Sequence, residues 1–259
     1  MNRLKHLGFV LVLVAFSGTA TAYSYSGYTW GHFPITWYLD SSGYPMSISN
    51  NQLKDAFQYA FDAWQNAKFD GRCTAVRFKF GGMINSNGTR RDGKNVISFS
   101  FSHNYDGSMG KTTIYHGSGN LITEADIVFP IENDINFSVA PKAWQYDLVG
   151  IAMHQIGLML GLSNSKEQDA TMYGGKWPSA GDTSWGTLAD DDKQAIVMLY
   201  PANCPGTVAD QGEIDVADTA DSDVPTGKCS TDFSNAGSGN FFLPFLLMFM
   251  LLISRRKSA

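Results

Sequence analysis

Hydrophobic and polar residues in the first quarter of the chain follow two different periods. Within residues 32–40 the segment ITWYL alternates and is rich in β-forming side chains, which predicts a strand. From position 53 to position 64 the apolar residues recur every three or four positions, with polar residues between them, and predict an amphipathic helix that packs on a sheet. The apolar face of this helix consists of Leu53, Ala56, Phe57, Ala60, Phe61 and Trp64.

Four further strands are indicated at 76–80, 96–101, 111–116 and 122–130, where β-forming residues are bounded by turn-forming Asn, Asp, Gly and Ser. A closing helix is expected after them. The run Asp190, Asp191 and Asp192 suits the positive end of a helix dipole, an apolar face follows it, and Pro201 ends the pattern.

Nearly every residue from 148 to 160 is apolar, so we expect a buried helix here rather than a surface one. Asp147 is a suitable N-cap, because its carboxylate can accept from the free N–H groups of the first turn. Gly161 supplies the left-handed conformation that ends the helix. This helix carries the residues on which the functional interpretation depends.

The stretch 154–173 resembles the signature of the matrixins, metzincin metallopeptidases of the M10 type. Their motif H-E-x-x-H-x-x-G-x-x-H is followed by a turn that contains methionine, the Met-turn. His154 stands at the first histidine position, Gly161 at the glycine, and Met172 within ATMY, where matrixins have A-x-M-Y. The segment LADDDKQAIVMLYP is similar to their closing helix, so the resemblance covers about 28–201. It implies an α+β zincin fold with a twisted, mixed, five-stranded sheet, three helices and a Met-turn.

The resemblance fails at the positions that carry the chemistry. Gln155 stands where the general-base glutamate is expected, and Leu158 and Asn164 stand at the second and third histidine positions. Catalytic zinc needs three protein ligands and an open position. Leucine has no lone pair, a neutral amide oxygen suits zinc poorly, and glutamine cannot take a proton at neutral pH. His154 is therefore a remnant ligand, Gln155 an inactive base position, and Leu158 a residue expected to be buried where metal and ligand would lie.

Other interpretations of the histidines stay open. The apolar helix could simply contain a core histidine. His103, Asp106 and His116 could form a structural zinc or calcium site, because family members bind such ions in this region. The H-x-D spacing of those sites is missing, however, and solvated loop residues are the alternative.

Segments 111–116 and 122–130 resemble the two strands that precede the active-site helix in bacterial matrixin-like peptidases. One of those strands forms the edge of the substrate cleft, and a peptide substrate adds to it as an extra strand. The resemblance thus implies an extended peptide or protein ligand. Nucleic acid is not expected, because the net charge is −5 and no basic stripe is visible.

The N-terminus predicts export. Residues 1–22 form a signal peptide with basic Arg3 and Lys5, a short apolar run and the cleavage site Ala20-Thr21-Ala22, although a membrane anchor is the alternative. The matrixin-like domain is assigned to 23–203. Residues 204–240 are acidic and read as a disordered linker, with a calcium-binding run as the less favoured interpretation.

The C-terminal segment 241–259 is apolar up to position 253 and ends with Arg255, Arg256 and Lys257. This layout resembles a bacterial C-terminal sorting signal, which predicts a mature form lacking 241–259. A plain membrane anchor and, less well, a GPI signal are the alternatives. Membrane association through this segment is therefore expected.

Three cysteines occur at Cys73, Cys204 and Cys229. In an exported protein Cys73 and Cys204 could form a disulfide that ties the end of the domain to the sheet, and Cys229 would then be left over. Pairing cannot be read from the sequence alone.

These features favour an exported, catalytically inactive pseudopeptidase that holds extended peptides in the former active-site cleft and needs no cofactor. The alternative is a zinc-dependent metalloendopeptidase with an unorthodox metal site, in which case zinc is the cofactor. A purely structural envelope protein is a third interpretation.

Overall fold

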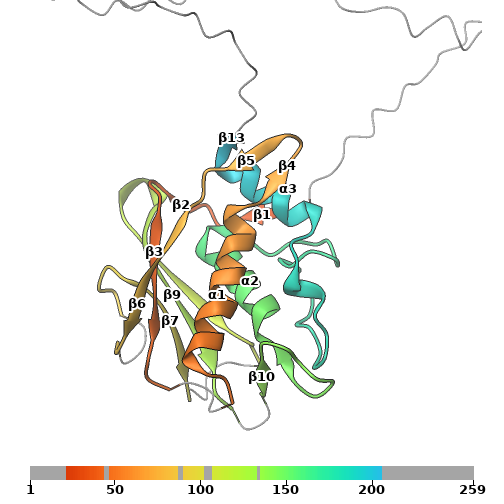
Figure 1. The fold of residues 1–259 in the computed structure, drawn as a ribbon. Helices are drawn as coiled ribbons and strands as arrows, with labels where there is room; N and C mark the ends of the chain where they lie inside the picture. The colour runs from red at the N-terminus through yellow and green to blue at the C-terminus, as the bar shows by residue number, and fades with distance from the viewer. Residues whose placement is uncertain (1–21, 44–46, 87–89, 102–106, 133–134, 206–259) are drawn as a thin grey trace, which may run out of the picture. The chain divides into compact units, whose positions relative to one another are not determined.

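The computed structural model describes residues 22–43, 47–86, 90–101, 107–132 and 135–205 (Figure 1), which all lie in the first of two compact units, 1–211. The expected signal peptide up to position 21, most of the acidic linker and the apolar C-terminal segment lie outside the described residues. Within the described part, no helix is both long and apolar enough to cross a membrane.

The main sheet is mixed, as expected, and has one more strand than the five expected. Its order is β2-β9-β7-β3-β6, with parallel pairs throughout, and β8 pairs antiparallel with β9. The strand that was not expected is β2, which has two residues. The strand expected at 76–80 begins two residues later and extends further. The bounds are β2 Thr29–Trp30, β3 Ile35–Asp40, β6 Phe78–Ile84, β7 Asn95–Ser100, β8 Lys111–His116 and β9 Leu121–Pro130.

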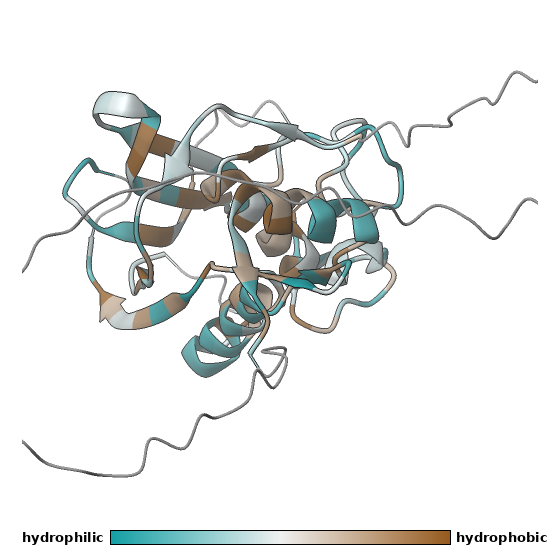
Figure 2. Cartoon of the chain, turned by 90° about the horizontal axis from the view of Figure 1, so that it is seen from above, coloured by the Kyte–Doolittle hydropathy of each residue, from teal (hydrophilic) through white to brown (hydrophobic). Residues whose placement is uncertain are grey.

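Three α-helices occur in the described residues: α1 Asn50–Gln65, α2 Leu148–Met159 and α3 Asp190–Leu199. Helix α1 begins at a capping box in which Ser49 and Gln52 bond reciprocally. The six apolar residues expected on its face are all buried. Helices α1 and α2 lie side by side (Figure 1), and the Trp64 indole donates to the Met153 carbonyl at 2.9 Å. Hydrophilic and apolar residues alternate along α1 and α3, whereas α2 is mostly apolar, and Figure 2 colours the chain by this property.

Two short strand pairs and one three-stranded sheet lie outside the main sheet. They are β1 Ser24–Tyr25 with β12 Leu162–Ser163, β10 Phe137–Ser138 with β11 Tyr146–Asp147, and β4 Lys68–Phe69 with β5 Arg72–Thr74 and β13 Pro201–Asn203. Two short 3-10 helices lie at Ser118–Asn120 and Ser184–Gly186. A disulfide joins Cys73 in β5 to Cys204 just after β13, which ties the end of the domain to its interior.

Candidate functional site

Both ends of α2 are built as the sequence predicts. Asp147 caps the first turn, its carboxylate accepting from the Val149 N–H at 3.0 Å. Gly161 follows the helix with a φ of 90°, in the left-handed region. A side chain at Gly161 would also overlap with the Tyr28 carbonyl oxygen, and the Gly161 carbonyl accepts from the Ser26 N–H at 2.9 Å. The glycine is therefore required both by its backbone conformation and by the chain that crosses it.

The Met-turn is held by a buried carboxylate at the start of α3. Asp192 is fully buried and accepts from the N–H groups of Thr171 at 2.7 Å, Met172 at 2.9 Å and Ala189 at 2.9 Å. Burial raises the pKa of Asp192, and these three donors act in the opposite direction by favouring the ionised form. This carboxylate thus joins the turn below α2 to the closing helix.

Met172 packs directly against α2. A Cβ at Gly157 would overlap with the Met172 sulfur and lie 2.9 Å from a ring carbon of Trp64. Glycine at position 157 therefore allows both side chains to reach the helix backbone. The methionine is almost fully buried in the same core cluster.

His154 is 4% exposed and is held in one orientation. Its Nδ1 lies 2.8 Å from the carbonyl oxygen of Thr171, so Nδ1 carries the hydrogen and the other ring nitrogen, Nε2, has the lone pair. The ring stacks on Trp185 at 4.8 Å between centroids and 9° between planes, and Trp177 lies 5.1 Å away. Burial lowers the pKa of His154 to about 4, so the imidazole is neutral at physiological pH.

Gln155 points away from His154 and toward the sheet. Its side chain is 1% exposed, and the Thr112 hydroxyl lies 2.7 Å from Oε1 and 3.0 Å from the Gln155 carbonyl oxygen. Gly110, just before β8, packs against the same side chain, because a Cβ there would lie 3.0 Å from Cγ of Gln155. The general-base position of the motif is thus an attachment between α2 and the edge strand.

Leu158 and Asn164 behave differently from each other. Leu158 is only partly buried against the core, so the expectation that it is buried in place of the metal is wrong. Asn164 is exposed, and its backbone carbonyl accepts from the Ser24 hydroxyl at 2.7 Å.

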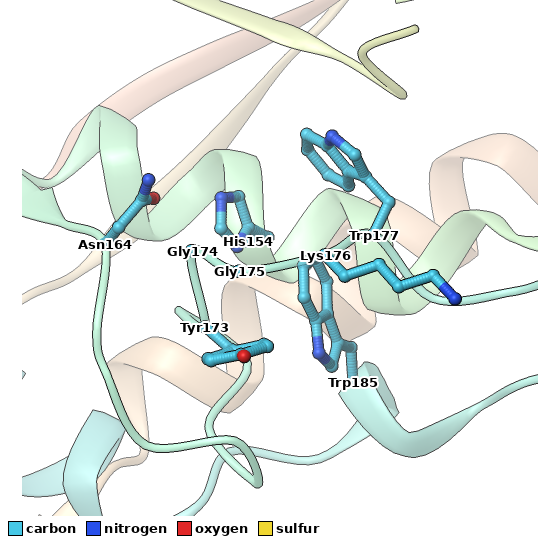
Figure 3. A pocket seen from close by; sticks show the side chains of 8 residues that line it. All are labelled: His154, Asn164, Tyr173, Gly174, Gly175, Lys176, Trp177 and Trp185. Carbon is cyan, nitrogen blue, oxygen red and sulfur yellow. The ribbon is translucent and has the colours of Figure 1, made fainter.

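A cavity of about 150 Å³ brings the first and third ligand positions of the motif together (Figure 3). Neither Gln155 nor Leu158 lines it. The lining residues are His154, Asn164, Tyr173, Gly174, Gly175, Lys176, Trp177 and Trp185. The polar side chains that line the cavity are therefore one imidazole, one amide, one phenol and one lysine, beside two tryptophans.

A family model matches the sequence of the segment that contains the buried helix, the Met-turn and the mixed sheet. The model of the matrixins, peptidase family M10, matches residues 29–201. This chain belongs to the matrixin family. The fold class expected from the resemblance is thereby confirmed.

Individual matrixins are similar to this chain at low identity. Metalloendoproteinase 5-MMP of Arabidopsis thaliana is 30% identical over 171 residues, which are 62% of this chain and 43% of the relative. Matrix metalloproteinase-25 of Mus musculus is 24% identical over 188 residues, and matrix metalloproteinase-16 of Homo sapiens 25% over 187. Each of these two matches covers 69% of this chain and 28% of the relative. The chain thus matches less than half the length of each relative.

The zinc that the family signature implies does not fit the donors in this cavity. Zinc in proteins takes thiolates, imidazoles and carboxylates, with three such ligands at a catalytic site. Only His154 supplies one of these, through Nε2, since Asn164 offers an amide and Leu158 no donor. Across the described ranges, no group of three or more His, Cys, Asp or Glu residues is placed to hold a metal.

The structural metal site remains a prediction. His103 and Asp106 lie outside the described residues. His116, the third candidate, is exposed at the end of β8 and stacks on Tyr28 with 4.3 Å between ring centroids.

Several residues of the site were not expected from the sequence. Trp177 and Trp185 form the aromatic walls, Thr112 binds Gln155, and Asp192 holds the Met-turn. The pair Gly174-Gly175 gives a local signal for close approach, since a side chain at Gly174 would lie 2.8 Å from Asn164 Cγ. The tryptophans and Asp192 have no such local signal.

Proposed function

We propose that this protein is a non-proteolytic matrixin that binds extended peptides along the edge strand β8. The donor set of the cavity carries this proposal: His154 is the one imidazole among the three ligand positions of the motif. A single imidazole does not hold zinc at useful affinity, so neither a metal-activated water nor a Lewis acid is available for hydrolysis.

The environment of Gln155 supports the same conclusion independently of the metal. A general base must reach the proton that it removes. The Gln155 side chain is buried, is bound to Thr112 and does not line the cavity beside His154. Its amide also has no basic lone pair at neutral pH, and loss of a general base typically costs about 100- to 10,000-fold in rate.

Strand β8 supports peptide binding. It bonds to β9 on one side, and among the described strands none pairs with its other side. An unpaired edge offers backbone donors and acceptors to an added strand. Thr112 fixes this edge to α2 through Gln155, so the edge strand is attached to the helix that carries His154. An extended peptide bound to β8 would therefore add to a strand that contacts the helix carrying His154.

Metal content tests the proposal against a zinc-dependent metalloendopeptidase, the function that the names of the relatives suggest. Purified protein should contain no stoichiometric zinc by elemental analysis after dialysis against zinc-containing and then metal-free buffer. One tightly held zinc per chain that is lost in a His154→Ala variant would overturn the proposal and favour the enzyme.

Restoring the signature tests the same point from the other direction. Gln155→Glu alone should produce no cleavage of a generic protein substrate, because the metal ligands are still missing. The triple variant Gln155→Glu, Leu158→His, Asn164→His should gain zinc affinity, with the double variant Leu158→His, Asn164→His as the control that separates metal binding from base restoration. Chelator-sensitive cleavage by Gln155→Glu alone would contradict the proposal.

We also propose that the domain acts outside the cytoplasm, released or held at a membrane. The signal-peptide pattern at 1–22 and the basic end after the apolar run at 241–253 support this. Intact mass spectrometry of protein from its native host should give a form that begins near Tyr23 and lacks 241–259. A species still ending at Ala259 would favour the plain anchor.

A further inference from the structure

A second hollow lies between the C-terminal half of α1, strand β4 and the segment that leads into α3 (Figure 1). Its volume is about 390 Å³, within the range of about 300–1,000 Å³ that is usual for small-molecule sites. Among the described residues, none lines both this hollow and the cavity beside His154. We call it the α1–α3 groove, and the lining residues that matter here are Tyr59, Ala63, Lys68, Met153, Leu188 and Lys193.

The floor of the α1–α3 groove is apolar. Met153 of α2 and Leu188, just before α3, line it and are almost fully buried. Tyr59 and Ala63 are four positions apart on α1, so they share one face of the helix and form a wall. Tyr59 is 55% exposed, which leaves its ring free to cover a guest. Because methionine sulfur makes favourable contacts with aromatic rings, floor and wall together suit an aromatic guest.

Lysines provide the charge of the groove. Lys68 and Lys193 line it, and none of the other eight lining residues, all within the described part of the chain, carries a charge. Lys193 pairs with Asp190 at 3.1 Å, whereas Lys68 makes no salt bridge with any described residue. Two lysines and the carboxylate of Asp190 leave one net positive charge, in a chain whose net charge is −5. The guest that matches this charge is a monoanion.

Both lysines stand on backbone that is fixed by other contacts. Lys68 begins β4 and lies opposite Cys73 of β5, which the disulfide joins to Cys204. Lys193 belongs to α3, and its N–H donates to the Ala189 carbonyl at 3.0 Å. Strand β4 and helix α3 contact each other, so the two lysines reach the groove from neighbouring elements. A fixed backbone lowers the ordering cost of binding.

We propose that the α1–α3 groove binds a small aromatic carboxylate, with its ring on Met153 and Leu188 and its anionic group facing Lys68 and Lys193. A neutral aromatic molecule would leave the net positive charge unmatched, and a dianion would exceed it. The inference is independent of the proposed peptide binding, because the groove includes no residue of β8. The protein would thus have a small-molecule site apart from its edge strand.

Two probes of nearly equal shape test the site. Naphthoate and its neutral analogue naphthamide are titrated into purified protein that carries isotope-labelled methionine methyl groups, and the shifts are followed by NMR. The methyl group of Met153 should move with both probes, whereas that of Met198, which is exposed on α3 outside the groove, should not. Naphthoate should bind about fivefold more tightly, the effect of partly exposed ion pairs, and high salt should reduce this preference.

Three results of these titrations would overturn the proposal. The first is the absence of any Met153 shift up to the solubility limit of the probes. The second is equal affinity of naphthoate and naphthamide. The third is an equal shift at Met153 and Met198, which would indicate adsorption without a site.

Lysine variants test the source of the preference. Lys68→Met keeps much of the side-chain length but removes the net positive charge, so the preference for naphthoate should disappear. The double variant Lys68→Met, Lys193→Met leaves the carboxylate of Asp190 alone and should favour naphthamide. Lys54→Met is the matched control, because Lys54 pairs with exposed Asp55, lies outside the groove and should retain the preference. An unchanged preference in folded Lys68→Met would contradict the assignment.

A tyrosine variant tests the contact with the ring of the guest. Tyr59→Ala should weaken naphthoate and naphthamide by the same factor, about fivefold, because both lose an aromatic contact. Trp144→Ala, at an aromatic residue that is 60% exposed and lies outside the groove, should change neither affinity. Unchanged affinities in Tyr59→Ala would show that the ring binds elsewhere and would overturn the proposal. None of these measurements involves a peptide, so failure of the proposed peptide binding would leave their outcome unaffected.

Discussion

The candidate site contains two sets of positions that differ sharply in their structural roles. The positions that shape the site make close contacts: Gly157 and Gly161 leave no space for a Cβ, Met172 packs against Gly157, and Asp192 accepts from N–H groups of the Met-turn. The positions that would perform the chemistry, 155, 158 and 164, carry residues with other contacts. Gln155 binds the edge strand, Leu158 packs on the surface of the core, and Asn164 lies exposed at the cavity.

The contacts that hold the site in shape are made between residues of the chain itself. Three backbone donors meet Asp192, and Thr171 passes this constraint on to His154 through its carbonyl. The orientation of His154 is therefore set by the Met-turn, which Asp192 of the closing helix holds, and by the stacked ring of Trp185. The residues at positions 155, 158 and 164 take no part in this connection from Asp192 through Thr171 to His154.

The largest expected effect comes from removing the carboxylate that holds the Met-turn. Asp192→Ala should lower the free energy of unfolding by about 3 kcal/mol or more, because three N–H groups lose their acceptor in a buried place. Urea denaturation measures this. Asp190→Ala is the matched control, since Asp190 is exposed and pairs only with Lys193, and it should change stability by less than about 0.5 kcal/mol. Equal effects of both variants would contradict the role of Asp192.

The free energy of unfolding should fall at acidic pH because His154 is buried in its neutral form. Its pKa falls from 6.5 to about 4 on folding, so the unfolded chain takes up the proton more readily. This contribution is fully present above pH 6.5 and is lost as the pH falls toward 4, amounting to about 3 kcal/mol. Other groups also titrate in this range. The informative quantity is therefore the difference in pH dependence between the native chain and His154→Gln, and identical profiles would show that His154 does not titrate this way.

Overpacking at the contact between α2 and the Met-turn should cost less. Gly157→Ala places a methyl group against the Met172 sulfur and Trp64 and should destabilise the domain by about 1–3 kcal/mol. Thermal unfolding of a double-mutant cycle with Met172→Ala checks the cause, because the shortened side chain makes room. The cost of Gly157→Ala should then decrease, and additive effects would mean that the methionine is not the obstacle.

The smallest effect is expected at a former ligand position. Leu158→Ala should cost about 1 kcal/mol, less than the 2–5 kcal/mol typical of a buried leucine, because the side chain is only partly buried. Asn164→Ala, at the other substituted ligand position, should change stability by less than about 0.5 kcal/mol. A loss above 2 kcal/mol for Leu158→Ala in chemical denaturation would restore the original expectation of full burial.

Local rules account for most of what the sequence predicts correctly. The capping carboxylate of Asp147, the left-handed Gly161 and the periodic face of α1 depend on neighbours within one or two turns. The role of Asp192 could not be predicted, because its partners Thr171 and Met172 lie about twenty positions away along the chain. The prediction that Leu158 is buried failed for a similar reason. Helical spacing shows on which face of the helix a residue lies, but not which other residues cover that face.

The disulfide between Cys73 and Cys204 closes a loop that spans 131 positions of the chain and includes almost every residue of the site. In the chain-entropy description, a loop of this length stabilises the folded domain by about 5 kcal/mol relative to the reduced chain. Reduction of this disulfide would therefore lower the stability of the folded domain that contains the site. Protein produced under reducing conditions would start from a lower stability, and each variant described above would be measured against a different reference.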